Sequence, residues 1–208
     1  GSGSGGVWAH NPSAVLQPGA DGVVVVRYKT TGNSSLTINA GGTQSVLSGV
    51  VNLGVGSLIK QGSGTLSLPS ANTYSGGTTV SAGTLKVSVA SVGAVGAITS
   101  SALGTGPATV ASGATIDLNG NTVFNDLSLA GTGVSSGGAL SNSSASVAAA
   151  ATGPISLTAT TSIISSPGIT LGTVNSSAYA LNVTAGTGAG TGDITFNGAL
   201  TFSGENIS

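Results

Sequence analysis

The sequence predicts an all-β protein that folds as a parallel β-helix, a β-solenoid with coils of roughly 20 residues. Three observations carry this prediction. Apolar and polar residues alternate over many short segments, each bounded by glycine, asparagine, serine or proline, which is typical of strands and turns. No segment places apolar residues at helical spacing. Finally, residues 64–68 and 83–87 share the pattern Gly-Thr-Leu-x-aliphatic, at a separation that suits one short coil.

The short segments define which side chains we expect to face the core. In each of them two apolar residues separated by one position lie on the same face of a strand. Leu85 is thus expected to point inward and Lys86 outward, so that Leu85→Asp would be damaging and Lys86→Asp nearly neutral. The inward pairs are Leu36 and Ile38, Leu66 and Leu68, Leu85 and Val87, Ile116 and Leu118, Leu127 and Leu129, Ile155 and Leu157, Ile169 and Leu171, Leu181 and Val183, and Ile194 and Phe196.

Internal similarity favours a solenoid over a sandwich or a barrel. Residues 78–87 and 108–118 share one order of strand, small-residue turn and strand, and a looser echo of the Gly-Thr-Leu pattern begins at Gly113. A unit of this size forms one coil, which stacks on the next at about 4.8 Å. The interior is then a column of small aliphatic side chains. A chain with three Phe, one Trp and no Met suits such a column.

The composition excludes several classes of protein. Charged residues make up 4% of the 208 residues, and the net charge is −1, so the chain has no basic surface for nucleic acid or anionic lipid. A mean hydropathy of +0.42 argues against disorder. The aliphatic runs are far shorter than the roughly 20 residues of a membrane span. With no cysteine, disulfides and thiolate metal sites are excluded.

Three regions follow from these patterns. Residues 1–6 form a flexible Gly/Ser linker or tag. Residues 7–29 contain the single tryptophan, Trp8, and two of the four basic residues, and are either an amino-terminal cap or a strand donated to a neighbouring subunit. Residues 30–208 form the solenoid. Its last stretch, 192–208, is rich in strand signals, and we expect no cap there.

The stretch 59–87 resembles the autotransporter-associated β-strand repeat. The departures are small, since Pro69 and Ser70 replace the more usual Ser-Gly. The matching residues are Lys60, Gly62, Gly64, Thr65, Leu66, Asn72, Thr73, Tyr74, Gly76, Gly77, Thr78, Thr79, Val80, Gly83, Thr84, Leu85 and Val87. The resemblance implies a right-handed parallel β-helix of the passenger type, secreted or displayed at the surface of a Gram-negative bacterium.

Structural roles account for the other motif residues. Gly76, Gly77 and Gly83 are expected to turn the backbone at positive φ. We expect Tyr74 to cover a turn with its hydroxyl in solvent. The asparagines are expected in turns, where they bond neighbouring backbone or stack between coils. They are Asn72, Asn119, Asn121 and Asn125.

Catalytic interpretations find little support. Residues 133–137 match G-x-S-x-G, but that motif needs a following helix and a later histidine, and the only histidine, His10, lies upstream. Residues 1–6 match G-x-G-x-x-G without a preceding strand. Residues 188–196 only faintly resemble a calcium-binding nonapeptide. Asp117 and Asp126 form the only close acidic pair, with no basic residue nearby in sequence.

We therefore predict no enzyme, no catalytic, cofactor-binding or metal-binding residue, and no cofactor. The predicted function is a non-catalytic structural segment of a bacterial surface or extracellular β-helix protein, either a stalk or a self-associating fibre subunit. The alternative is an adhesin with a carbohydrate- or ice-binding face, and a polysaccharide-degrading enzyme ranks last. The expected partners are copies of itself or adjoining coils, end to end, with host or matrix glycans as a second class.

Overall fold

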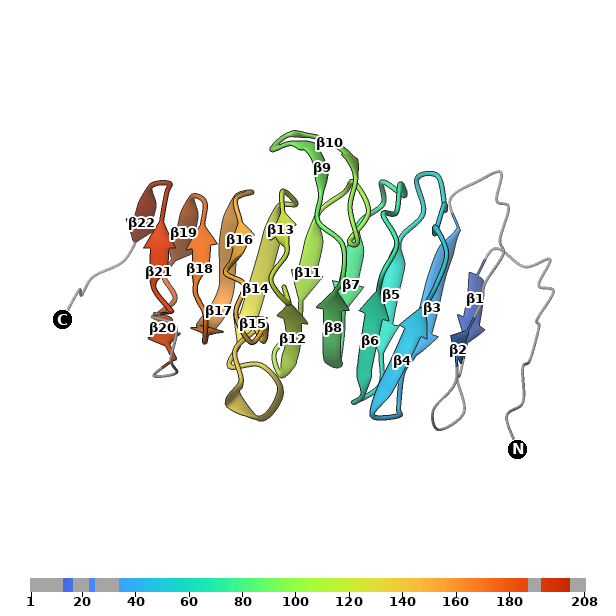
Figure 1. Ribbon diagram of the computed structural model, residues 1–208, viewed down its shortest axis with the longest axis horizontal. Coiled ribbons are helices and arrows are strands. Elements are labelled where there is room, and N and C mark those ends of the chain that lie inside the picture. The colour runs from blue at the N-terminus through green and yellow to red at the C-terminus, as the bar shows by residue number, and fades with distance from the viewer. Residues whose placement is uncertain (1–12, 17–22, 25–33, 187–191, 203–208) are drawn as a thin grey trace.

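The chain folds into a stack of parallel coils, as the sequence predicts. The computed structural model describes residues 13–16, 23–24, 34–186 and 192–202. Within them every strand pairs in parallel with a strand of another coil, except in one antiparallel hairpin. Figure 1 shows the strands side by side along the long axis of the molecule, with β1 and β22 near opposite ends.

Three faces make up the solenoid. The first two are joined in one 16-stranded sheet, because β17 runs unbroken around the corner between them. The first face contains β1 (Ser13–Leu16), β3 (Ser35–Asn39), β5 (Leu58–Gln61), β7 (Thr78–Val80), β11 (Ala108–Val110), β14 (Leu127–Gly131), the beginning of β17 (Ile155–Ser165), β19 (Val174–Ser177) and β22 (Leu200–Phe202). The second face contains β2 (Val23–Val24), β4 (Gln44–Leu47), β6 (Thr65–Leu68), β8 (Gly83–Val87), β12 (Ala114–Asp117), β15 (Leu140–Asn142), the end of β17 and β20 (Leu181–Ala185). The third face contains β13 (Thr122–Val123), β16 (Ala149–Ala151), β18 (Ile169–Leu171) and β21 (Ile194–Phe196).

The register confirms the internal similarity. Leu66 pairs with Leu85, and Leu85 pairs with Ile116, so the echoes seen in the sequence are stacked coils. On the first face, the spacing of successive partners shows that the coils differ in length. The partners are Ala14, Leu36, Leu58, Thr78, Ala108, Leu127, Ile155, Val174 and Leu200. The shortest coils match the predicted length, and the longer ones contain insertions.

Two insertions account for the longest coils. Between Thr78 and Ala108 the hairpin of β9 (Val92–Ala94) and β10 (Ala97–Ser100) leaves the stack, and Figure 1 shows it projecting at the top. Between Leu127 and Ile155 the chain includes η1 (Val134–Ser136), a short 3-10 turn. This turn is the only helical element among the described residues.

The core is the predicted aliphatic column. Leu66, Leu85, Ile116, Leu140 and Ile163 lie in register one above another, each at most 1% exposed. The inward pairs predicted from the sequence are buried as far as β18. In the last described coil the inward residues Leu181, Val183, Ile194 and Phe196 are half-buried or exposed.

The predictions for the amino-terminal region concern mostly residues that the structure does not describe. Residues 1–12, Trp8 and His10 among them, lie outside the described part. Within 7–29, β1 pairs with β3 and β2 with β4, both in parallel. The cap and the donated strand both stay predictions.

Candidate functional site

A buried lysine is the most unusual feature of the repeat. Lys60 alternates with Ile59 on β5, so it shares the inward face with Leu58, and its side chain is fully buried. Its ammonium donates hydrogen bonds to the carbonyl oxygens of Gly62 and Gly64, both at 2.6 Å, and of Ala82 at 2.9 Å. Because Ala82 belongs to the next coil, Lys60 joins two coils. We call this arrangement the lysine cage.

The cage explains the glycines around it. Gly83 has φ +66°, and a Cβ there would lie closer than any real contact to Lys60 Nζ and to the carbonyl oxygens of Gly62 and Gly64. The predicted positive φ is confirmed for Gly77 and Gly83 but is wrong for Gly76. At Gly76 the restriction is steric instead, since a Cβ would meet the backbone of the previous coil.

Lys60 carries an electrostatic cost. Burial removes water from the ammonium and lowers the pKa of Lys60 from 10.5 to about 8. The three carbonyl oxygens offset part of that cost, because they replace water as acceptors for the ammonium. The sequence identifies Lys60 only as a residue of the repeat motif. The strand pattern nonetheless predicts that Lys60 faces inward, because it follows Leu58 by two positions in one strand.

Tyr74 is buried, and the prediction that its hydroxyl reaches solvent is wrong. The hydroxyl donates to Thr78 Oγ1 at 2.6 Å, and Thr78 Oγ1 donates to the carbonyl oxygen of Leu103 at 2.8 Å. The ring packs against Gly104, where a Cβ would collide with it. Burial raises the pKa of Tyr74 above its usual value. Tyr74 is therefore a bonded core residue that ties its own coil to the next.

Asparagine side chains join coils at a corner of the solenoid. Asn72 accepts from the amide of Val51 at 2.8 Å and donates to the carbonyl oxygen of Ala102 at 2.7 Å. Asn125 accepts from Ser101 Oγ at 3.0 Å and donates to the carbonyl oxygens of Gly104 and Gly106. The predicted bonding of turn asparagines to neighbouring backbone is confirmed, with Ser101 lying between the two.

Asn119 and Asn121 also lie in a turn. Asn119 has φ 47°, and Asn121 Nδ2 donates to the carbonyl oxygens of Val87, Leu118 and Asn119. The bond to Val87 reaches the preceding coil. The prediction that these asparagines lie in turns and bond neighbouring backbone is therefore confirmed.

Stacking brings a basic residue to Asp117. Lys86 is its register partner, and Lys86 Nζ lies 3.8 Å from Asp117 Oδ2. Asp117 also accepts hydrogen bonds from the amides of Asn119 and Ser143 and from the Ser143 hydroxyl. A carboxylate with all these donors is a structural anchor. Asp126 takes no part in this network and lines a hollow elsewhere on the surface.

The remaining sequence motifs form no constellation. Residues 133–137 surround η1, which leads into β15 rather than a helix. His10 and residues 1–6 lie outside the described residues, as do 188–191 of the calcium-like stretch. Among the described residues no three His, Cys, Asp or Glu side chains gather where they would hold a metal ion. Nor does the described part contain a helix long and apolar enough to cross a membrane.

One comparison with known proteins gives a match. Residues 58–87 match the family described as passenger-associated-transport-repeat, almost the same boundaries as the repeat identified in the sequence. No curated protein and no solved structure matches the chain. The matched segment contains Lys60, Tyr74 and Gly83, so the lysine cage and the buried tyrosine lie within the repeat. This repeat and the parallel solenoid around it together fit a repeat protein of the autotransporter passenger type.

Proposed function

We propose that the chain serves as a non-catalytic stalk segment of a secreted or surface-exposed bacterial passenger. One observation carries this proposal: several polar side chains of the repeat point inward and bond one coil to another. Lys60 bonds to Ala82, and Asn72 bonds to Val51 and Ala102. Residues whose hydrogen bonds are used between coils stiffen the stack and are not free to bind a ligand.

The same proposal covers partners along the axis. Each described coil pairs with the next through parallel backbone hydrogen bonds, and further coils or copies of the chain can use the same bonds. With only 4% charged residues, such contacts would depend weakly on salt. We propose no nucleic-acid partner and no insertion of this segment into a membrane.

Sedimentation velocity of the full chain, combined with small-angle scattering, tests the stalk. We expect elongated particles, either single or joined end to end, whose association changes little between low and high salt. Incubation with a panel of polysaccharides is expected to release no shorter sugars. A compact sphere in solution, or cleavage of any polysaccharide in the panel, would contradict the proposal.

A binding face is the second candidate, and one structural feature favours it. From β3 onward, outward side chains on the first face form a single row across the coils, which we call the threonine row. It is irregular in sequence because the coils differ in length, yet all its members except Ile59 carry a hydroxyl or an amide. In stacking order they are Thr37, Ile59, Thr79, Thr109, Ser128, Ser156, Asn175 and Thr201.

An ice-recrystallisation assay and a glycan-binding panel separate this candidate from a plain stalk. If the threonine row orders water or sugar hydroxyls, the full chain should be active and Thr109→Lys in the middle of the row should abolish the activity. Thr184→Lys, on an exposed position of the second face, is the matched control. An inactive wild-type chain would eliminate the binding face and leave the stalk.

A further inference from the structure

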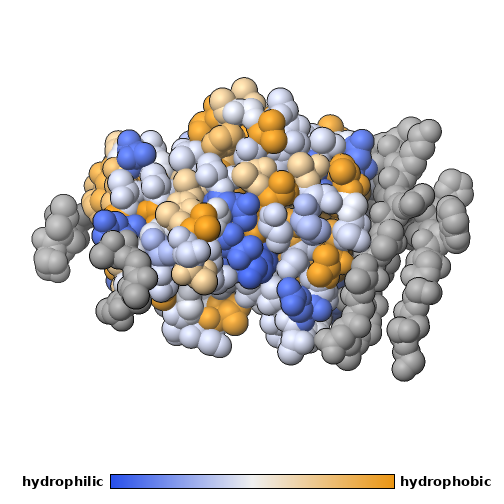
Figure 2. All heavy atoms as spheres, in the orientation of Figure 1, coloured by the Kyte–Doolittle hydropathy of each residue, from blue (hydrophilic) through white to orange (hydrophobic). Residues whose placement is uncertain are grey.

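The hairpin β9–β10 contributes little to the solenoid core. The coil that contains it extends from Thr78 to Ala108, and is much longer than the next coil, which extends from Ala108 to Leu127. The extra length projects into solvent with Val92 56% and Val95 46% exposed. Figure 2 shows apolar atoms gathered on this projection. Exposed valines are unfavourable in water, so the insertion calls for an explanation beyond folding.

The strands of the hairpin also have open edges. Among the described strands, β9 pairs only with β10 and β10 only with β9. Residues 91–100 contain no charged residue and no proline, two of the devices by which natural proteins protect an edge from association. The strands are short and their pairing shifts register between Ile98 and Ser100, so the uncharged edge is suited to pairing with a short strand of another molecule.

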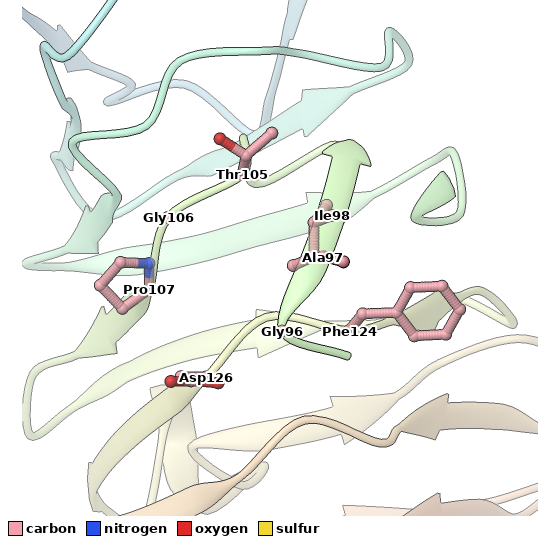
Figure 3. Close-up of a pocket in the computed structure, with 8 residues that line it drawn as sticks. All are labelled: Gly96, Ala97, Ile98, Thr105, Gly106, Pro107, Phe124 and Asp126. Atoms are coloured by element: carbon pink, nitrogen blue, oxygen red, sulfur yellow. The ribbon is translucent and has the colours of Figure 1, made fainter. Parts of the chain in front are cut away.

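A hollow lies beside β10. Its volume is about 270 Å³, and three segments line it: Ala97 and Ile98 of the hairpin, Thr105 to Pro107, and Phe124 with Asp126. Figure 3 shows these segments and their side chains. The hollow is smaller than a typical pocket for a drug-sized ligand. It is large enough for one long side chain.

Asp126 gives the hollow its charge. The side chain is exposed, and its carboxylate takes no hydrogen bond or ion pair from the described residues. The apolar side chains of Ile98, Pro107 and Phe124 also line the hollow. An unpaired carboxylate in a hollow that exposes some apolar side chains favours a cationic group on an aliphatic stem, because the stem packs while the charge pairs.

We propose that the β10 edge and this hollow bind an extended segment of a partner protein in which aliphatic residues flank a lysine or arginine. The partner strand pairs with the outer edge of β10, its aliphatic side chains cover the exposed valines, and its basic side chain enters the hollow and meets Asp126. This site is independent of the stalk function, since neither the hairpin nor Asp126 belongs to the core column.

Two other occupants are outcomes that the experiment distinguishes. Of the cations of a second copy, Lys60 is caged and Lys86 faces Asp117, while Arg27 and Lys29 lie outside the described residues. A glycan would need several polar partners, whereas the side chains around the hollow supply one carboxylate and the Thr105 hydroxyl. The aliphatic hairpin therefore favours a protein segment.

Fluorescence anisotropy with labelled synthetic peptides tests the proposal on the full chain. One probe is a heptapeptide that alternates valine and threonine around a central lysine, and the second has glutamate in place of the lysine. We expect saturable binding of the lysine peptide, at least fivefold weaker binding of the glutamate peptide, and weaker binding at high salt. Asp126→Asn should weaken binding of the lysine peptide at least fivefold. Asp193→Asn, which removes another exposed carboxylate, should leave that binding unchanged.

The apolar contribution has its own matched pair. Val95→Thr should weaken binding, whereas Val147→Thr, a valine 54% exposed elsewhere, should leave it unchanged, and all four variants should melt like the wild type. Equal binding of both peptides, no binding of either, or an affinity for the lysine peptide that Asp126→Asn leaves unchanged would overturn the proposal. So would a dimer of the wild-type chain that Val95→Thr dissociates, which would make a second copy the occupant, or binding of neutral sugars in the hollow.

Discussion

Leu85→Asp is expected to unfold the coils on either side of β8. Leu85 is fully buried between Leu66 and Ile116 in the core column, and the new carboxylate would have no hydrogen-bond donor there. Burying such a group costs several kcal/mol, on the order of the whole free energy of unfolding of a typical domain. Thermal denaturation followed by circular dichroism measures the loss.

The control for this substitution is Lys86→Gln in the same strand. Lys86 points outward as predicted, so losing its ion pair should cost no more than about 1 kcal/mol. Lys86→Asp is a poorer control than the sequence indicated, because it would place a second carboxylate against Asp117. If Leu85→Asp and Lys86→Gln melted at the same temperature, the register assigned to β8 would be wrong.

Lys60→Met should lower the free energy of unfolding by roughly 2–4 kcal/mol at pH 7. Methionine fills a similar volume but donates no hydrogen bond, so the carbonyl oxygens of Gly62 and Ala82 would lose the ammonium that they accept from. Chemical denaturation of the wild type and the variant gives the difference. Thr79→Met, on the outward face of the adjacent β7, is the matched control and should be nearly neutral.

The pH dependence of this difference tests the same cage. The pKa of Lys60 is about 8 in the folded chain and 10.5 as an ordinary lysine, so between these pH values the unfolded chain binds more protons. The free energy of unfolding of the wild type should therefore rise with pH across this window, by up to roughly 3 kcal/mol. Lys60→Met should lack this rise, and a fall with pH in the wild type alone would refute the lowered pKa.

Much of the fold could be predicted from the sequence because its information is local and periodic. The alternation in Gly-Thr-Leu-x-aliphatic defines which side chains face inward, and the echo at 83–87 gives the stacking partner of 64–68. Coil length was harder, because the apolar residues 92–98 resemble core strands in sequence. Only the structure shows that they leave the stack as a hairpin.

The environment of particular side chains depends on distant residues. Tyr74 is buried because Gly104, far along the chain beyond the hairpin, leaves room for its ring. Lys86 meets Asp117 because the hairpin is excluded from the register between β8 and β12. Neither contact could be predicted from the sequence, because each depends on the length of the coil between the two residues. Lys60 is different, because its strand position alone indicated that it faces inward.

The central claim is that polar residues of the repeat bond neighbouring coils of a parallel solenoid to each other. Nuclear magnetic resonance of the Lys60 ammonium tests it most directly, at a pH well below the pKa of about 8 so that the group is protonated. The structure predicts slowly exchanging ammonium protons with through-hydrogen-bond couplings to the carbonyl carbons of Gly62, Gly64 and, in the next coil, Ala82. An ammonium that exchanges freely with water and shows no coupling to Ala82 would contradict it.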